Sequence, residues 1–203
     1  MTMGLETIMG VALGIGLSAA VGFRLFVPFT LMSIAALTGY LDLTSGFEWI
    51  GSYPALLIFA TATLLEIVAY YVPWLDNLLD TIATPAAVVA GAIVTASVVG
   101  DISPLLRWTL AAIAGGGVAG AVQTSTTLLR GASSVSTGGI GNPVITTAEV
   151  ASSFSLSVFT LLLPFVAAVT VLGAIIWLGR TLRRRNEPGP SEPGEGTQLF
   201  HEA

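Results

Sequence analysis

The fold is decided by one stretch of the sequence, residues 7–41, which read TIMGVALGIGLSAAVGFRLFVPFTLMSIAALTGYL. Arg24 is the only charged residue in this run. A helix needs about 20 apolar residues to cross a bilayer, because each residue rises about 1.5 Å and the hydrocarbon core is roughly 30 Å thick. The run is too long for one crossing and short for two. It therefore predicts two helices joined by a tight hairpin around Gly22-Phe23-Arg24, with Pro28 in the first turns of the second helix.

The composition of the whole chain agrees with a membrane environment. Of its 203 residues, 54% are hydrophobic and 9% are charged, whereas a soluble domain carries about 25% charged residues to cover its surface. Most of the surface must therefore face hydrocarbon. Lysine is absent, and before residue 180 only Arg24, Arg107 and Arg130 are basic, so no basic face is available to bind nucleic acid. The chain has no cysteine, which excludes disulfides and thiolate chemistry.

The remaining apolar segments predict an all-α, multi-pass transmembrane helical bundle with about six spans. After the two helices of residues 7–41, further spans are expected at residues 52–72, 85–99, 104–127 and 150–178. The last span is long enough to tilt or to bend at Pro164. Residues 186–203 are rich in proline, glycine and glutamate, which predicts a disordered tail. We expect a transmembrane domain over residues 1–179, followed by a basic cluster and a tail over residues 180–203.

A change of period precedes the fourth predicted span. The apolar residues of segment 74–82 share one helical face, and Asp76 and Asp80 share the other. This pattern predicts a short helix in the membrane interface, which Thr84-Pro85 would end. Two aspartates four residues apart can hold Mg²⁺ on a phosphate substrate in membrane lipid enzymes, but the chain has no second pair of this kind. A solvated polar face is therefore favoured over a metal site.

Small side chains repeat every four residues in two of the predicted spans. They are Gly10, Gly14, Ser18 and Gly22 in the first span, and Ala111, Gly115 and Ala119, beside Gly116 and Gly120, in the fifth. Membrane helices associate where small residues let their backbones approach closely. We expect both helices to pack tightly against neighbours within the chain, in preference to forming the face of a dimer.

Two charged residues within the apolar part of the chain are candidate site residues, because a charge at bilayer depth costs about 2.5–3.5 kcal/mol on insertion scales. Glu66 lies about two turns before the end of the third predicted span. We expect it either to form an ion pair with Arg24, Arg107 or Arg130, or to sit protonated in a polar cavity. A structural ion pair and a role in transport or binding are about equally supported. Arg24, at the tip of the predicted hairpin, is expected to extend toward the headgroups.

Residues 131–147 are rich in glycine, serine and threonine and carry no charge. Non-helical backbone at membrane depth is tolerated only where it is buried in protein or lines a water-filled cavity. The segment therefore predicts either a re-entrant loop with a polar lining, close to Gln123, Asn142 and Glu149, or a flexible external loop. Its lack of charge favours the re-entrant loop. Together with the break at residues 22–28, this would resemble transporters with discontinuous helices.

Signatures of catalysis are missing from the sequence. It contains no HExxH, no GxSxG and no phosphate loop, and its only histidine, His201, lies in the predicted tail. We therefore expect neither enzymatic activity nor a cofactor.

Several motifs together resemble one protein family. They are 22–28 GFRLFVP, Glu66 with 70–81 YYVPWLDNLLDT, 84–87 TPAA, and 138–143 GGIGNP followed by Glu149. In this order they resemble a bacterial family of small membrane proteins known as domain of unknown function 4126. The resemblance extends to about Arg185. It implies a single multi-helix membrane domain and no particular reaction.

Two functional hypotheses follow. The first is a small channel or transporter for an ion or small solute, with a polar path that includes Arg24, Glu66, Gln123, Asn142 and Glu149. The second is a non-transporting scaffold or assembly factor, which would bind another membrane protein or a second copy of the chain. The arginines after the last span predict a bacterial inner-membrane protein with a cytoplasmic C-terminus. With about six spans, the N-terminus would lie on the same side.

Overall fold

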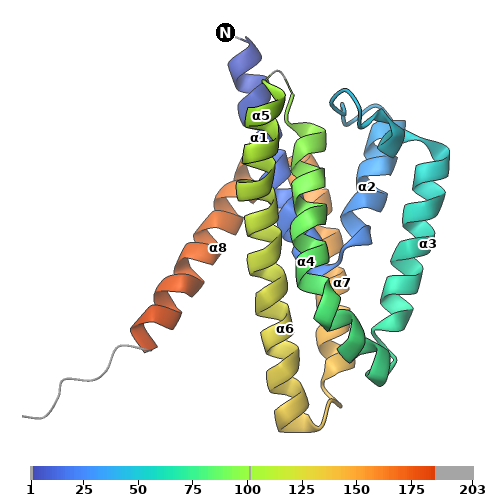
Figure 1. Cartoon of the computed structure of the whole chain (residues 1–203), viewed down its shortest axis with the longest axis vertical. Helices are drawn as coiled ribbons and strands as arrows, with labels where there is room; N and C mark the ends of the chain where they lie inside the picture. Colours follow the sequence, from blue (N-terminus) through green and yellow to red (C-terminus); the bar gives the residue numbers. More distant parts are fainter. Residues whose placement is uncertain (1, 101, 186–203) are drawn as a thin grey trace, which may run out of the picture. The chain divides into compact units, whose positions relative to one another are not determined.

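The structure, a computed structural model, describes residues 2–100 and 102–185; within these helices, the side chains of residues 2–3, 73–78, 80 and 182–185 lie outside the described part. The described part is all-helical and contains no strand, which confirms the predicted fold class. Figure 1 labels the helices in chain order. They are α1 (Thr2–Phe23), α2 (Phe26–Leu37), the 3-10 helix η1 (Glu48–Gly51), α3 (Tyr53–Ala69), α4 (Pro73–Val98), α5 (Pro104–Leu110), the π-helix η2 (Ala111–Gly116), α6 (Gly117–Thr137), α7 (Asn142–Leu162) and α8 (Pro164–Arg185).

Among the described residues, five helical stretches are long and apolar enough to cross a membrane. They are Gly4–Phe23, Thr81–Val98, Pro104–Thr137, Asn142–Leu162 and Pro164–Thr181. The helices α2 and α3 are shorter, with 12 and 17 residues. The chain is compact over Met1–Val171, and Leu172–Ala203 forms a separate unit. All site residues described below belong to the first unit.

The predicted hairpin in residues 7–41 is confirmed. The helix α1 ends at Phe23, and α2 begins at Phe26; Figure 1 shows that the chain reverses direction between them. Pro28 lies in the first turn of α2, as predicted. At about 1.5 Å per residue, however, the 12 residues of α2 extend only about 18 Å, so α2 is shorter than a full crossing.

The expected separate interfacial helix is wrong, because α4 continues through Pro85 to Val98. A proline inside a helix removes one backbone hydrogen bond and favours a kink. Figure 1 shows the first turns of α4 inclined to the rest of the helix. Beyond the proline, α4 is held by buried packing of Ala87, Ala90 and Val94. The change of period at residues 74–82 therefore marks the start of a long helix.

The expected single span at residues 150–178 is also wrong. The structure divides it into α7, which ends at Leu162, and α8, which begins at Pro164. Leu163, between them, has φ −137° and ψ 66°, outside the helical region. The ring of a following proline disfavours helical backbone in the residue before it. Pro164 therefore separates two helices, although a kinked single helix was equally compatible with the sequence.

The predicted re-entrant loop is not confirmed. Residues 131–137 complete α6, residues 142–147 begin α7, and a short turn joins them. Gly138 and Gly139, with φ of 64° and 85°, make this turn. Serine and threonine fit the helices because their hydroxyls bond to a backbone carbonyl one turn earlier. Thr137 donates to the Ser133 carbonyl in this way.

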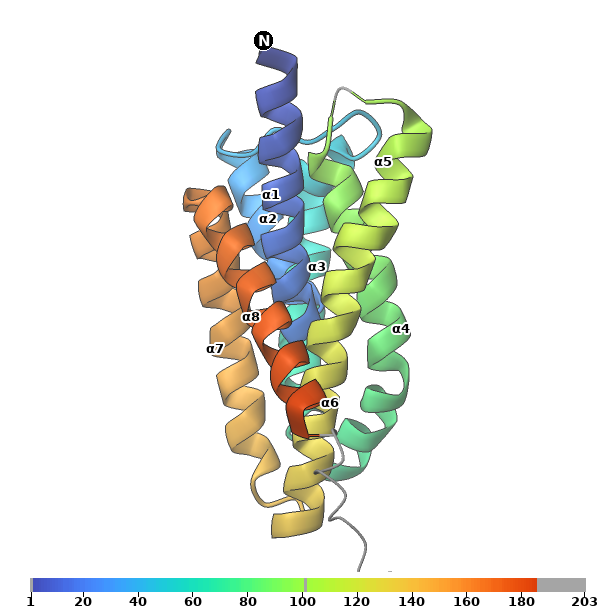
Figure 2. The ribbon, with the colours of Figure 1, turned by 90° about the vertical axis from the view of Figure 1, so that its left-hand side faces the viewer.

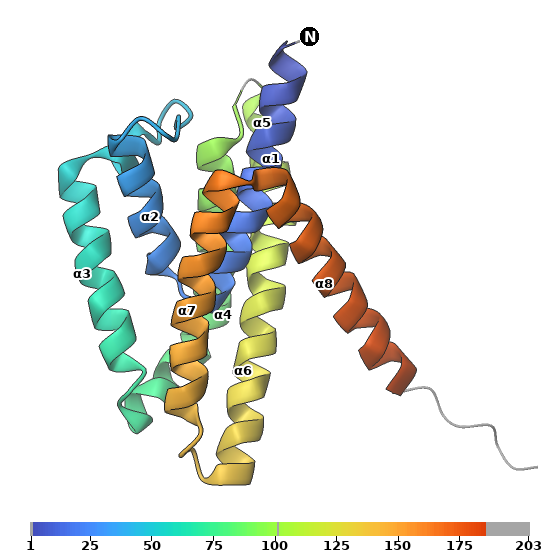
Figure 3. The ribbon, with the colours of Figure 1, turned by 180° about the vertical axis from the view of Figure 1, so that it is seen from behind.

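The small-residue stripes pack within the chain, as predicted. The helix α1 packs against α4, α6 and α7, and Figures 2 and 3 show it flanked by α6 and α7. A Cβ added to Gly14 would lie 2.7 Å from Thr95 Cγ2, and one added to Gly22 would lie 2.6 Å from the Ala119 carbonyl oxygen. Both distances are too short, so these contacts require glycine. Close backbone packing therefore holds α1 in the bundle.

Candidate functional site

An ionic cluster lies where α1 ends. Glu149 of α7 accepts a hydrogen bond from Arg24 at 2.7 Å and from Arg130 Nε at 3.0 Å, and Arg130 Nη2 also bonds to its carboxylate. Arg24, Arg130 and Glu149 are 1%, 3% and 4% exposed. Removing such charges from water costs several kcal/mol per ion, which close pairing must offset. One carboxylate thus neutralises part of the charge of two buried guanidinium groups.

Tyr70, which follows the last residue of α3, is the aromatic member of the cluster. The guanidinium carbons of Arg24 and Arg130 lie 3.9 Å and 4.2 Å from the centre of its ring. An aromatic face attracts cations, and the attraction grows when the groups are shielded from water. Tyr70 therefore contacts both arginines and connects α3 to the end of α1 and to α6.

Glu66 binds backbone groups at the same helix break. Its carboxylate accepts the N–H groups of Leu25 at 2.8 Å and Phe26 at 3.0 Å. These donors lie at the start of α2, where the first N–H groups of a helix have no partner inside it and a negative charge is favoured. Glu66 also interacts electrostatically with Arg24. With both carboxylates ionised, the charges of Arg24, Arg130, Glu66 and Glu149 sum to zero.

A serine of α7 joins the end of α1 to the cluster. Ser153 Oγ lies 2.9 Å from the Ala20 carbonyl oxygen and 3.4 Å from that of Arg24, and donates toward both. The Ala20 carbonyl also accepts the Arg24 N–H at 3.1 Å, so the hydroxyl adds a second donor there and reaches the Arg24 carbonyl as well. Side chains therefore bond to the backbone on both sides of the helix break. Ser153 donates to carbonyls at the end of α1, and Glu66 accepts from N–H groups at the start of α2.

Ser153 belongs to a polar stripe that follows one face of α7. The stripe consists of Thr146, Glu149, Ser153, Ser157 and Thr160, all of them buried. Residues three and four apart are neighbours on a helix surface, so these side chains form one line. Within the described part of the chain, the hydroxyls of Thr146, Ser157 and Thr160 have no hydrogen-bond partner. A buried polar group without a partner costs about 1–3 kcal/mol, and three on one line require an explanation.

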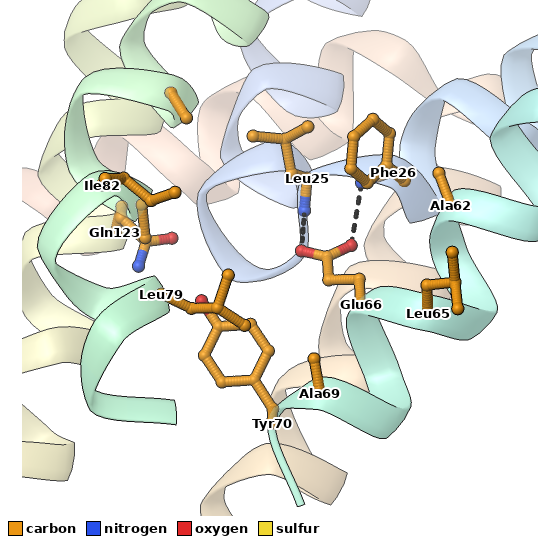
Figure 4. Close-up of a pocket in the computed structure, with 12 residues that line it drawn as sticks. Leu25, Phe26, Ala62, Leu65, Glu66, Ala69, Tyr70, Leu79, Ile82 and Gln123 are labelled. Carbon is orange, nitrogen blue, oxygen red and sulfur yellow. Dashed lines mark hydrogen bonds between the residues drawn. The ribbon is translucent and has the colours of Figure 1, made fainter. Parts of the chain in front are cut away.

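A cavity of about 430 Å³ lies beside Glu66. Figure 4 shows it between α3, α4 and the start of α2. Its walls are mostly apolar, and Glu66, Tyr70 and Gln123 supply its polar side chains. Two of these residues, Glu66 and Tyr70, also contact the ionic cluster or the helix break beside it, so the cavity adjoins the cluster.

The structure brings together most of the predicted site residues. Arg24 and Glu149 form an ion pair, and Glu66 and Gln123 line the adjacent cavity. Asn142 lies apart from them at the first residue of α7, where its Nδ2 donates to Ser134 Oγ at 3.1 Å. The expected extension of Arg24 toward the headgroups is wrong, because the fold encloses its guanidinium between Glu149 and Tyr70. Asp76 and Asp80 lie on the first turns of α4, and their side chains are outside the described part.

Sequence reasoning missed two members of the cluster and most of the stripe. Arg130 was considered only as a partner for Glu66, whereas it pairs with Glu149. Tyr70 entered the sequence analysis only as part of the motif at residues 70–81. The stripe was detectable, because Thr146, Glu149, Ser153, Ser157 and Thr160 recur every three or four residues in a segment that is otherwise largely apolar.

These features define the class of protein: a multi-pass integral membrane protein with apolar helices and a charge-balanced cluster enclosed between them. The family model described as a domain of unknown function (DUF4126) matches residues 11–184. The chain therefore belongs to this family, as the sequence motifs indicated. No curated protein and no solved structure matches the chain.

Proposed function

We propose that the chain is a small channel or transporter whose substrate is a small anion. The observation that carries the proposal is the polar stripe of α7, in which partnerless buried hydroxyls lead to two arginines. A hydroxyl can donate to an anion or accept from a cation. The two guanidinium groups beside the stripe are cationic and bind anions, so they favour an anion over a cation as the substrate.

Glu149 would act as the gate of this path. Its carboxylate lies between Arg24 and Arg130, the place where a small anion would be bound most strongly. In the observed state the carboxylate occupies that place itself. An anion could replace it only when Glu149 moves aside, so conduction would require a conformational change within the bundle.

The scaffold hypothesis has less support. It relied on the small-residue stripes as surfaces for a partner, but Gly14, Gly22 and Gly115 face neighbouring helices of the same chain. Binding to a second copy or to another membrane protein stays a prediction. So does the placement in a bacterial inner membrane, with the arginines of residues 180–185 on the cytoplasmic side.

Anion flux through purified protein in vesicles tests the proposal. The double variant Ser157→Ala/Thr160→Val removes two hydroxyls that make no bond in the fold. We expect its chloride flux to fall about tenfold or more, since one lost hydrogen bond is worth about 1–3 kcal/mol. Its thermal stability should not decrease, because no bond of the folded protein is lost.

The matched control is Ser155→Ala, which removes an exposed hydroxyl from the same helix and should leave chloride flux unchanged. Flux of potassium measured in parallel reports selectivity. Chloride flux no greater than in empty vesicles would refute the proposal. Equal flux in the double variant and the unaltered protein would show that the stripe serves only to pack α7 against α1.

A further inference from the structure

The cavity beside Glu66 has the size and lining of a ligand site. Its volume of about 430 Å³ lies in the range of about 300–1,000 Å³ that is typical of small-molecule pockets. Leucine, isoleucine, phenylalanine and alanine side chains form most of its wall. Figure 4 shows Glu66 and Tyr70, at the end of α3, and Gln123, on α6, around the same space. The cavity therefore combines apolar walls with a few converging polar groups.

The position of the opening indicates how a ligand would enter. Leu65 of α3 and Ile82 of α4 line the cavity but are 65% and 56% exposed, so they mark its outer edge. Both belong to apolar helices of a membrane protein, and their exposed surfaces therefore face lipid. A molecule that enters between them comes from the hydrocarbon of the bilayer, which favours an apolar ligand over a water-soluble one.

The charged groups near the cavity indicate whether it favours a charged or a neutral ligand. Two arginines and two glutamates already balance one another, and Glu66 is committed to the Leu25 and Phe26 N–H groups. A charged ligand would add an ion with no counter-charge in an apolar space, which is strongly unfavourable. A neutral ligand avoids this cost. A carboxylate has about four lone-pair sites, so the Glu66 oxygens can still accept a hydrogen bond from a ligand.

We propose that this cavity binds a neutral, mostly apolar molecule that carries one hydroxyl, a lipid-soluble alcohol, with the hydroxyl donating to Glu66. The apolar body would lie against Leu25, Phe26 and Leu79. The proposal does not depend on anion transport. It concerns equilibrium binding from the lipid phase, and the ligand need not cross the membrane.

A series of probes with one apolar body tests the chemistry. We choose 1-adamantanol as the neutral alcohol, adamantane as the body without a donor, 1-aminoadamantane as the cation and adamantane-1-carboxylate as the anion. Binding is measured by equilibrium dialysis against the full chain in lipid nanodiscs, with empty nanodiscs subtracted. We expect the alcohol to bind about tenfold more tightly than each of the other three, because adamantane lacks the hydrogen bond and the ions carry an unbalanced charge.

Two variants locate the binding in the cavity. Ala62→Phe fills it from α3, and Ala86→Phe fills it from α4, so one variant can replace the other if either fails to fold. Both should abolish saturable binding of 1-adamantanol. Ala112→Phe adds the same ring at an exposed position of η2 and should leave binding unchanged. Tighter binding of either charged probe, or unaltered alcohol binding in a folded cavity-filled variant, would overturn the proposal.

Discussion

Replacing Glu149 with glutamine is expected to destabilise the fold by about 3–5 kcal/mol, because the removal of one partner leaves buried charge uncompensated. The effect should be near the upper end of this range. Two buried guanidinium groups, of Arg24 and Arg130, share this one carboxylate, and glutamine cannot neutralise either. The quantity to measure is the free energy of unfolding of the purified protein in detergent, with thermal melting as a first comparison.

A double-mutant cycle separates charge from packing at this site. Arg130→Gln should cost less than Glu149→Gln, since Arg24 and Glu149 remain paired. The double variant should lose less stability than the sum of the single losses, by about 0.5–3 kcal/mol, as is typical of residues in direct contact. Glu6→Gln is the control, because Glu6 is exposed, and should stay within about 0.5 kcal/mol. Additive losses would mean that the cluster does not act as an electrostatic unit.

The second large effect is expected for Gly115→Ala in η2. A Cβ at this position would meet the backbone carbonyl of Gly91 and lie 2.8 Å from Thr95 Cβ, both on α4. Neither the backbone atom nor the Cβ can move away without shifting α4. Overpacking of this kind costs about 1–3 kcal/mol and occasionally more. We expect a loss of at least this size, measured by thermal unfolding in detergent.

Gly117 provides the control, because an alanine there is expected to leave the stability unchanged or to raise it. Gly117 lies two residues further along, and nothing lies within 4 Å of a Cβ built there. Alanine is favoured over glycine inside a helix by about 0.5–1 kcal/mol, so Gly117→Ala should be neutral or stabilising. Similar losses in both variants would show that this segment is sensitive to any side chain, and that the contact between η2 and α4 is not responsible.

The parts of the fold that could be predicted follow from local sequence, either from the length of an apolar run or from small side chains on one helix face. The hairpin after α1 follows from an apolar run that is interrupted by one arginine, and the close approach of α1 to its neighbours follows from glycines on one helix face. The effects of Pro85 and Pro164 could not be separated in the same way. One lies inside a kinked helix and the other begins a new one, although apolar residues after both prolines are buried.

The composition of residues 131–147 was misleading for a different reason. Serine and threonine disfavour helices in water because their side chains compete for backbone groups. In the ends of α6 and α7 they bond to a carbonyl one turn earlier and leave the helix intact, as Ser136 and Thr147 do with Ala132 and Pro143. Polar composition in an apolar chain therefore indicated a site but not its backbone conformation.

The candidate site was only partly predictable, because its pairing depends on contacts between distant segments. Charged residues in an apolar chain had to be candidates, and this reasoning found Arg24, Glu66 and Glu149. Which carboxylate meets which arginine depends on how α1, α6 and α7 pack. That information lies in the assembled bundle, so the pairing of Arg130 with Glu149 could not be derived from local sequence.

The separation of these residues along the chain also has a consequence for biosynthesis. Arg24 precedes Glu149 by 125 residues, which at about 5–20 residues per second corresponds to roughly 6–25 s of translation. During that interval Glu66 is the only carboxylate of the cluster that has been made. Until α7 is made, Arg24 and then Arg130 lack the Glu149 carboxylate, so we expect both to stay in a hydrated or lipid-headgroup environment. The ionic cluster is thus completed late in synthesis, and a chain truncated before α7 cannot form it.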